Sequence, residues 1–128
     1  MSTRHASPQA LLDHAGRVIE LARGAGAHVA DACLESSRAF TVHVHGGSIE
    51  TLKQSGTLGL GLRVIVDGAV GFCSGTDLSP EGLADLARRA VALARFSTPD
   101  EANGSPTPEE AGTAAHGDLE IFDEAALE

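Results

Sequence analysis

Aromatic residues are scarce in this sequence, which has no tryptophan, no tyrosine and four phenylalanines in 128 residues. This scarcity excludes an aromatic platform of the kind that stacks the bases of single-stranded nucleic acid. Apolar residues still make up 42% of the chain. The composition therefore predicts an aliphatic core in one domain, or in one domain followed by a tail.

Basic residues are absent from residues 97–128, whereas residues 1–96 hold all nine, together with nine of the 18 acidic residues. The body is thus neutral, and the tail carries the whole net charge of −9. This distribution argues against nucleic acid as a partner, because that partner requires a basic surface. The acidic tail is interpreted as a solvated, disordered segment.

Cysteine is also rare, and two residues, Cys33 and Cys73, cannot form a disulfide framework. Both lie in apolar stretches, so buried, reduced thiols are expected, although a bridge between them stays open. Residues 1–7 lack the apolar centre of a secretory signal, and no run approaches the length of a membrane span. The sequence predicts a soluble, cytoplasmic protein with no membrane partner.

Two segments have the pattern of amphipathic helices. The first begins at Ser7-Pro8, which suit the N-cap and the first helical position, and it ends at Gly24 and Gly26. The second begins in the same way at Ser79-Pro80, and Gly82 in its first turn costs about 1 kcal/mol relative to Ala. Its expected buried stripe consists of Leu83, Leu86, Ala87, Ala90 and Ala94.

Between these helices the sequence predicts strands at residues 30–37, 38–45, 48–55, 57–66 and 69–74. Gly46-Gly47 and Asp67-Gly68 are signals for tight turns. Leu52 is out of phase with Ile49, which suggests a β-bulge. The order of elements indicates an α+β fold, with an antiparallel sheet of about four to five strands and two helices packed on one face.

The composition changes after Phe96. Residues 1–96 are interpreted as one α+β domain, and residues 97–118 as an acidic linker rich in Pro and Gly. Residues 119–128 are interpreted as the start of a following carboxy-terminal domain, with a frayed terminus as the alternative. The apolar residues that suggest this restart are Leu119, Ile121 and Phe122, and residues 124–128 look like the opening of a helix.

His43 and His45 flank Val44 on an expected strand, so the two imidazoles share one face. Such a pair can bind a metal, with Cys73 as a conceivable third ligand. No fourth ligand stands out, and the polar face of a half-buried sheet produces the same alternation. The polar face is the preferred interpretation, and no metal site is assigned to this chain.

Other chemical motifs are incomplete. Gly59-x-Gly61 lacks a third glycine and lies inside a strand, which disfavours a dinucleotide loop. Ser74, Thr76 and Ser79 do not form a nucleophile elbow, and turn chemistry accounts for them. The paired acids lie in the tail, where no fold buries them, namely Glu109-Glu110 and Asp123-Glu124. No catalytic or cofactor-binding residue is assigned.

Five segments follow one another along the chain. They are Ala30 to Ala32 (ADA), Gly47 to Glu50 (GSIE), Gly56 to Phe72 (GTLGLGLRVIVDGAVGF), Ser74 to Glu81 (SGTDLSPE) and Ala90 to Arg95 (AVALAR). In order and spacing, these segments resemble the amino-terminal domain of the TldD/PmbA (TldE) proteins. The resemblance extends over about residues 10–123.

The resemblance implies a two-domain subunit much longer than this chain. TldD and PmbA subunits pair into a cytoplasmic heterodimeric metalloprotease that trims unfolded or leader peptides. Its zinc is bound on an H-E-x-x-x-H helix of the carboxy-terminal domain of TldD, and PmbA-type subunits lack that motif. This sequence contains no His-Glu pair, so no family site residue is carried onto it. Ser97 to Asp100 and Asp118-Leu119 are more similar to the PmbA branch.

Two functions follow as expectations. The first is the amino-terminal domain of a TldD/PmbA-type zinc metalloprotease subunit, which pairs with another family subunit and receives a peptide substrate. This chain alone is then inactive, and zinc belongs to the complete catalytic subunit. The second is a stand-alone protein-interaction module that pairs with peptides or partners through a sheet edge. The expected edge is residues 38–45 or residues 48–55.

Overall fold

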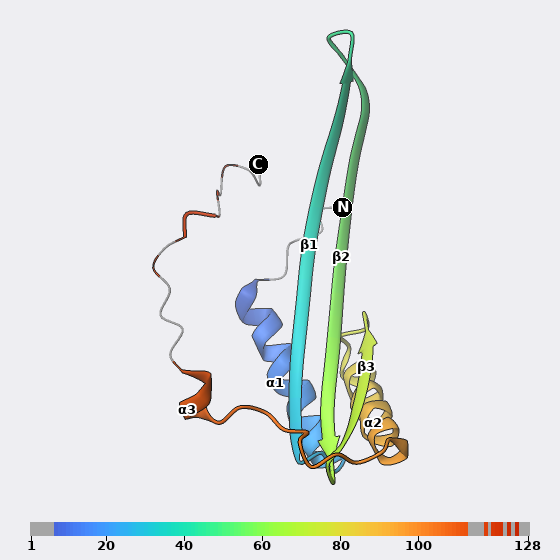
Figure 1. The fold of residues 1–128 in the computed structure, drawn as a ribbon. Helices are drawn as coiled ribbons and strands as arrows, with labels where there is room; N and C mark the ends of the chain where they lie inside the picture. Colours follow the sequence, from blue (N-terminus) through green and yellow to red (C-terminus); the bar gives the residue numbers. More distant parts are fainter. Residues whose placement is uncertain (1–6, 113–116, 118, 122, 124, 126–128) are drawn as a thin grey trace.

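A computed structural model describes residues 7–112, 117, 119–121, 123 and 125 of the chain. One antiparallel sheet, in the order β1-β2-β3, packs against helices, and the first two strands extend far beyond them as a long hairpin (Figure 1). The predicted α+β class and antiparallel sheet are thus confirmed. The elements are α1 (Pro8–Gly24), β1 (Val29–His45), β2 (Ser48–Val66), β3 (Ala69–Gly75), α2 (Pro80–Phe96) and α3 (Pro108–Ala111).

The two long helices begin as predicted. The Ser7 hydroxyl oxygen accepts a hydrogen bond from the Ala10 amide at 3.2 Å, and Pro8 opens α1. The Ser79 hydroxyl oxygen accepts one from the Gly82 amide at 3.1 Å at the start of α2. Each cap satisfies an amide that has no acceptor within the helix.

The sheet has three strands within the described residues, so the predicted number of four to five is wrong. The predicted strands 30–37 and 38–45 are both parts of β1, and 48–55 and 57–66 are both parts of β2. The polar and glycine positions that suggested breaks face one another, because Ser37 pairs with Thr57 and Arg38 with Gly56. Matched interruptions leave the ladder of hydrogen bonds intact, so both strands continue through them.

Both predicted turns are present. Gly46 and Gly47 have φ angles of +58° and +79°, and Asp67 and Gly68 have φ angles of +49° and +79°. Two successive residues with positive φ make the tight turn whose twist matches that of antiparallel strands. These turns set the register of β1 against β2 and of β2 against β3.

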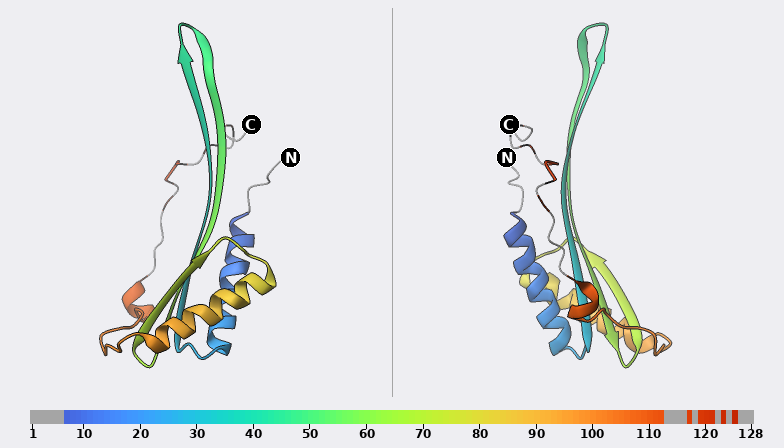
Figure 2. Two further views of the ribbon diagram at one scale, coloured as in Figure 1. Left: turned by 90° about the vertical axis from the view of Figure 1, so that its right-hand side faces the viewer. Right: turned by 60° about the vertical axis from the view of Figure 1, so that its left-hand side comes forward.

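The core lies between the helices and one face of the sheet. Val18 and Ala22 of α1 meet alternate residues of β2, from Leu60 to Val66, and the predicted stripe of α2. All five predicted stripe residues of α2 are buried, and Val91 joins them. Figure 2 shows α1 and α2 on the same side of the sheet. We call the opposite face, where Ser105 binds Asp31 at the base, the open face.

α2 packs against β3 through a close backbone contact. A Cβ atom built on Gly71 would lie 2.1 Å from the carbonyl oxygen of Ala90 and 2.6 Å from the amide nitrogen of Ala94. No side chain fits in that space. The glycine therefore allows the helix to approach the strand more closely than a substituted residue would.

The first part of the acidic tail is bound to the base of the sheet. The Asp100 amide and the Asn103 side-chain amide both donate to the Gly68 carbonyl oxygen, at 3.0 and 2.8 Å. The Ser105 hydroxyl donates to a carboxylate oxygen of Asp31 at 3.2 Å. This part is structured, unlike the disordered tail predicted, because the turn at Gly68 offers an unused carbonyl.

Farther along, Leu119 and Ile121 are exposed. Phe122 and most of the expected helix at 124–128 lie outside the described residues. No helix in the described part of the chain is long and apolar enough to cross a membrane.

Candidate functional site

The residues considered for metal binding lie in different places. His43 and His45 are exposed near the tip of the hairpin, whereas Cys73 pairs with Leu62 at its base and packs against the core. His43 pairs with Thr51, eleven positions from Leu62 along β2, which corresponds to roughly 35 Å. Cys73 therefore cannot complete a site with the two histidines. The described residues contain no group of three His, Cys, Asp or Glu that could hold a metal ion.

The two cysteines differ from the prediction. Cys33 is exposed on the open face of the sheet, so the expected burial is wrong for it, whereas Cys73 is half-buried on the face toward the helices. Cys33 pairs with Gly61 and Cys73 with Leu62, so the strand β2 lies between them and their side chains point to opposite faces. Both thiols are free, and this geometry leaves no room for a bridge.

Three of the serine and acidic candidates, Ser79, Glu110 and Asp123, make local hydrogen bonds at turns and helix ends, whereas Ser74 lies within β3 and not in a turn. Ser79 caps α2, as turn chemistry predicts. Glu110 accepts a hydrogen bond from the Thr107 amide in the capping box of α3, and Asp123 accepts one from the Ala125 amide. Glu124 lies outside the described residues. These contacts are local, between residues two or three positions apart in the sequence.

A shallow depression lies on the open face of the sheet. Gly59 and Gly61 form part of its lining, together with Cys33, Phe72 and Ser74, and its volume is about 470 Å³. The Phe72 ring lies against Gly61, because a Cβ there would be 3.3 Å from the ring. The two glycines thus make room for an aromatic side chain on a strand, and they do not form a phosphate loop.

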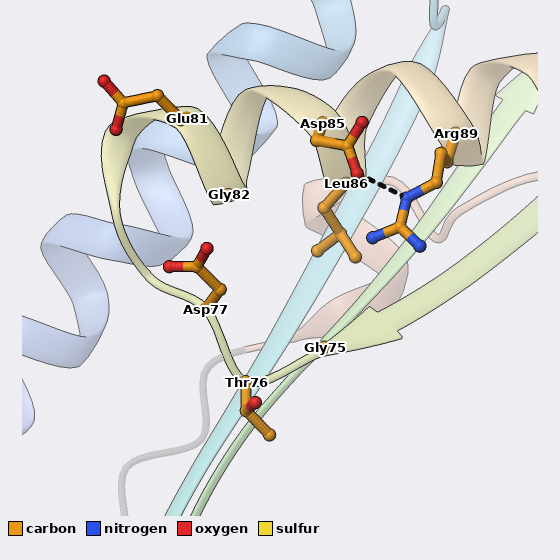
Figure 3. Close-up of a pocket in the computed structure, with 8 residues that line it drawn as sticks. All are labelled: Gly75, Thr76, Asp77, Glu81, Gly82, Asp85, Leu86 and Arg89. Atoms are coloured by element: carbon orange, nitrogen blue, oxygen red, sulfur yellow. Dashed lines mark ion pairs between the residues drawn. The ribbon is translucent and has the colours of Figure 1, made fainter.

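A second depression, of about 360 Å³, lies at the start of α2 (Figure 3). Asp77, Glu81 and Asp85 line it together with one cation, Arg89, whose guanidinium is paired with Asp85 at 2.8 Å. The Ser79 amide donates to Asp77 at 2.9 Å, and this bond, with one from the Ser79 side chain, lowers the pKa of Asp77. The surplus of carboxylates makes this helix end a poor anion site.

The largest feature without a structural explanation is the outer part of the hairpin. We call residues 37–57 the arm, and every residue in it is exposed. The arm is about 30 Å long, since nine residues of β1 span it, and all of it lies beyond the last pair of β3 with β2, Gly75 with Leu60. It projects away from both helices (Figure 2). A two-stranded hairpin is only marginally stable in water without a surface to pack on.

One face of the arm is apolar. Val42 pairs with Leu52 and Val44 with Ile49, so these side chains share a face with Phe40. We call these five residues the arm patch, and their exposed fractions range from 41% to 65%. The patch lies on the same face of the sheet as the core, because the alternation of β1 continues from Ala30 to Val44.

A β-bulge keeps this face apolar. The register shifts between His43, which pairs with Thr51, and Val44, which pairs with Ile49. The extra residue is Glu50, and it brings Ile49 back to the face of Leu52 although the two are three positions apart. The bulge predicted from Leu52 is thus confirmed. Without it, Ile49 would point to the polar face.

A polar band separates the arm patch from the core on that face. The band consists of Arg38 with its partner Gly56, and of Gln54, which pairs with Phe40. Below it the core resumes at Leu34 and Leu60. The patch is therefore a second apolar surface and not a frayed extension of the core.

The opposite face of the arm is polar, with Thr41 paired with Lys53 and His43 with Thr51. The two histidines belong to this face, as the preferred interpretation predicted. The arm also has open edges within the described residues, because β3 pairs with β2 only from Leu60 to Val66. The two predicted edge segments, 38–45 and 48–55, form the two sides of the arm.

Reasoning from the sequence alone missed the arm patch. The sequence predicts two separate short strands for these residues, and separate strands do not reveal a common face. The available signals were the alternation of Phe40, Val42 and Val44 and the phase break at Leu52. Pairing the two strands through the Gly46-Gly47 turn would have placed all five side chains together.

Known proteins share this architecture. A family model described as PmbA/TldA metallopeptidase domain 1 matches residues 30–94, which include the whole arm. Metalloprotease PmbA of Escherichia coli O157:H7 is 31% identical over 111 residues, which are 85% of this chain and 24% of that protein. The chain thus spans about a quarter of the length of this relative.

Two solved structures show the same fold. A proposed modulator of DNA gyrase from Bacteroides thetaiotaomicron matches with a TM-score of 0.82 and 22% identity, over 94% of this chain and 27% of its own. TldE from Thermococcus kodakarensis matches with a TM-score of 0.59 and 18% identity, over 72% of this chain and 21% of its own. Because the family model covers more than half of the sequence, this chain belongs to the PmbA/TldD metallopeptidase family and corresponds to its first domain.

Proposed function

We propose that this chain is the amino-terminal domain of a TldD/PmbA-type zinc metalloprotease subunit. It helps to form the subunit interface and the chamber through which peptides reach the active site. The proteolytic chemistry belongs to a carboxy-terminal domain or to a partner subunit. The observation that carries this proposal is the arm, an exposed hairpin with one apolar and one polar face, which lies inside the part of the chain that matches the first domain of the family.

The residues described here do not fit a zinc site, because they include no group of three suitable ligands. In the complete enzyme, zinc would activate a water molecule for attack on a peptide carbonyl. In this proposal, the chain binds the peptide and the partner subunit and orients them. An exposed strand edge offers amides and carbonyls to an extended peptide, and an apolar face offers a surface to a subunit.

The proposed partners are another subunit of the family and an unfolded or leader peptide, in the cytoplasm. The PmbA (TldE) branch is favoured, because the relative from Escherichia coli O157:H7 is named PmbA. A PmbA-type subunit would support catalysis in trans, with zinc held by the other subunit.

The decisive experiment is to sequence the gene downstream of the codon for Glu128 and to compare it with the intact mass of the native protein. An open reading frame that continues past Glu128 and encodes H-E-x-x-x-H would identify this chain as the amino-terminal domain of a TldD-type catalytic subunit. A continuing frame of similar length without that motif would identify a PmbA-type partner. A stop codon after Glu128, matched by the native mass, would refute the two-domain subunit.

A second experiment tests whether the isolated chain cleaves peptides. The purified chain is incubated with an unfolded peptide, with added zinc and with a chelator, and cleavage is followed by mass spectrometry. We expect no cleavage in any condition. Hydrolysis that requires zinc and stops with the chelator would contradict the proposal.

The alternative is a stand-alone interaction module that pairs with peptides or partners through a sheet edge. The observation that favours it is the pair of open edges on the arm. This alternative predicts a native protein that ends near Glu128, so the gene and mass comparison also decides between the two functions.

A further inference from the structure

The open face of the sheet carries an apolar row at its base. Val29 pairs with Ile65 and Ile65 with Val70, so the three side chains lie side by side across the three strands. They point away from the helices, because Val64 and Val66, on either side of Ile65, point into the core. Ile65 is nevertheless only 4% exposed, although it is not part of that core. A segment on the open face therefore covers it.

The segment at this position is the beginning of the acidic tail. The chain passes from the end of α2 around the turn between β2 and β3 to the other side of the sheet (Figure 2). Asn103 donates to the Gly68 carbonyl oxygen beyond the row, and Ser105 donates to Asp31 on its inner side. Ile65 lies between these two attachment points. The two residues from Asn103 to Ser105 span at most about 7 Å, so the chain has no slack to loop away from the row.

We infer that residues 97–105 form a reversible strap on the open face. In the closed form, which the structure shows, the strap covers Ile65. In the open form, the strap leaves the sheet while the rest of the domain stays folded, and solvent reaches the row of Val29, Ile65 and Val70. This inference does not depend on the proposed metalloprotease role.

The contacts that close the strap are few and exposed. Ser105 donates to the Asp31 carboxylate and accepts from the Arg63 guanidinium, at 3.2 Å in both cases. The side chains of Asp31 and Arg63 are 47% and 41% exposed. At the other end, the strap is bonded to one acceptor, the Gly68 carbonyl oxygen. Water can replace exposed hydrogen bonds at little net cost, so the strap should open far more often than the sheet unfolds.

Opening of the strap would enlarge the apolar surface of the open face. Val70 and Phe72 are two positions apart on β3 and share this face. Phe72 is 60% exposed and lines the depression that also contains Cys33. With the strap closed, Ile65 adds nothing to that surface. With the strap open, the row extends the surface from Phe72 to the base of the sheet, so the strap sets how much apolar surface this face exposes.

The first test is limited proteolysis of the full chain by a glutamate-specific protease, with the fragments identified by mass spectrometry. Glu101 lies within the strap, and cleavage after it requires the open form. We expect Ser105→Ala to raise the rate of this cleavage at least about threefold, because it removes one closing contact. The matched control is Thr107→Ala, which loses a hydroxyl that caps α3. That variant should be cleaved after Glu101 at the rate of the unmodified chain.

A second pair of variants leaves the sequence around the cleaved bond unchanged. Asp31→Ala removes the acceptor of Ser105 and should raise the rate of cleavage after Glu101 in the same way. Its control is Glu35→Ala, because Glu35 is the exposed acid four positions along the same face of β1. The control should leave this rate unchanged.

Hydrogen exchange of the unmodified chain tests whether the opening is local, and it needs no variant. The Asp100 amide donates to the Gly68 carbonyl oxygen at 3.0 Å and should be protected. We expect its exchange rate to change little in dilute urea, because local opening exposes little surface. The exchange of β2 amides that pair with β3 should become faster with urea, since it requires unfolding of the sheet.

Three results would overturn the inference. Equal rates of cleavage after Glu101 in Ser105→Ala and Thr107→Ala would show that Ser105 does not close a strap. An unprotected Asp100 amide would show that the segment does not lie on the sheet in solution. An Asp100 amide that exchanges only with the sheet would show that the segment does not open separately. None of these results bears on the gene and mass comparison, so the proposed function would still be decided separately.

Discussion

Gly71 of β3 and Ala90 of α2 are in direct backbone contact, and a Cβ on the glycine would lie 2.1 Å from the alanine carbonyl oxygen. We expect Gly71→Ala to lower the free energy of unfolding by about 2–4 kcal/mol, because the helix must move away from the sheet to admit a methyl group. Urea denaturation followed by circular dichroism measures this loss.

The matched control for this substitution is Gly59→Ala. A Cβ on Gly59 meets no atom within 4 Å, so the change should stay within about 0.5 kcal/mol. Equal losses in the two variants would show that the close approach of α2 does not limit stability.

Leu62 and Leu52 lie on the same face of β2 but in different surroundings, with exposed fractions of 0% and 59%. We expect Leu62→Ala to cost about 2–5 kcal/mol, because it opens a cavity in the core. Leu52→Ala should cost under about 1 kcal/mol in a dilute, monomeric sample, since water already reaches that side chain. Thermal unfolding of both variants checks this, and a comparable loss for Leu52 would mean that the arm supports the monomer.

Asp77 should make stability depend on pH in the acidic range. Hydrogen bonds from the Ser79 amide and then its side chain lower the pKa of Asp77 below 3.8. A lowered pKa in the folded state stabilises the fold above the unfolded value, and this contribution disappears as the pH falls through the folded pKa. The stability difference between the unmodified chain and Asp77→Asn should therefore shrink below about pH 3.8. A difference that stays constant from neutral to strongly acidic pH would contradict this.

Cys33 should react with thiol reagents faster than Cys73, because Cys33 is exposed and Cys73 packs against the core. With Ellman's reagent we expect one fast and one slow phase. Cys33→Ser should remove the fast phase, Cys73→Ser the slow one, and urea should make the two rates similar. Two fast phases in the folded chain would show that Cys73 is accessible. Mild oxidation should form no bridge within the chain.

Most of the domain body could be predicted from local chemistry. The caps at Ser7 and Ser79 and the turn at Asp67-Gly68 are short-range signals, and each occurs where the sequence places it. The contact of Gly71 with α2 was not predictable, since it depends on how two distant elements pack. Gly82 appeared only as a weak helix former, but a Cβ there would lie 2.4 Å from the Asp77 side chain.

The predicted number of strands is wrong for a physical reason. Ser37 and Gly56 look like ends of strands when each is considered alone, because polar and glycine residues often end strands. Paired across the hairpin, they occupy neighbouring rungs of one continuous ladder. The arm patch was missed for the same reason, since a face shared by two strands is visible only once their register is known.

The layout of the hairpin also bears on the order in which the chain folds. Its residues closest in sequence, around Gly46-Gly47, lie at the exposed tip, while the pairs that join the core, such as Ala30 with Val64, are far apart along the chain. Zipping from the tip would gain little apolar burial until it reached the base. The Asp67-Gly68 turn, by contrast, joins two strands that pack at once against the following helix. The nucleus of folding should therefore form around β2, β3 and α2, and the ladder should then grow outward, with the tip closing last.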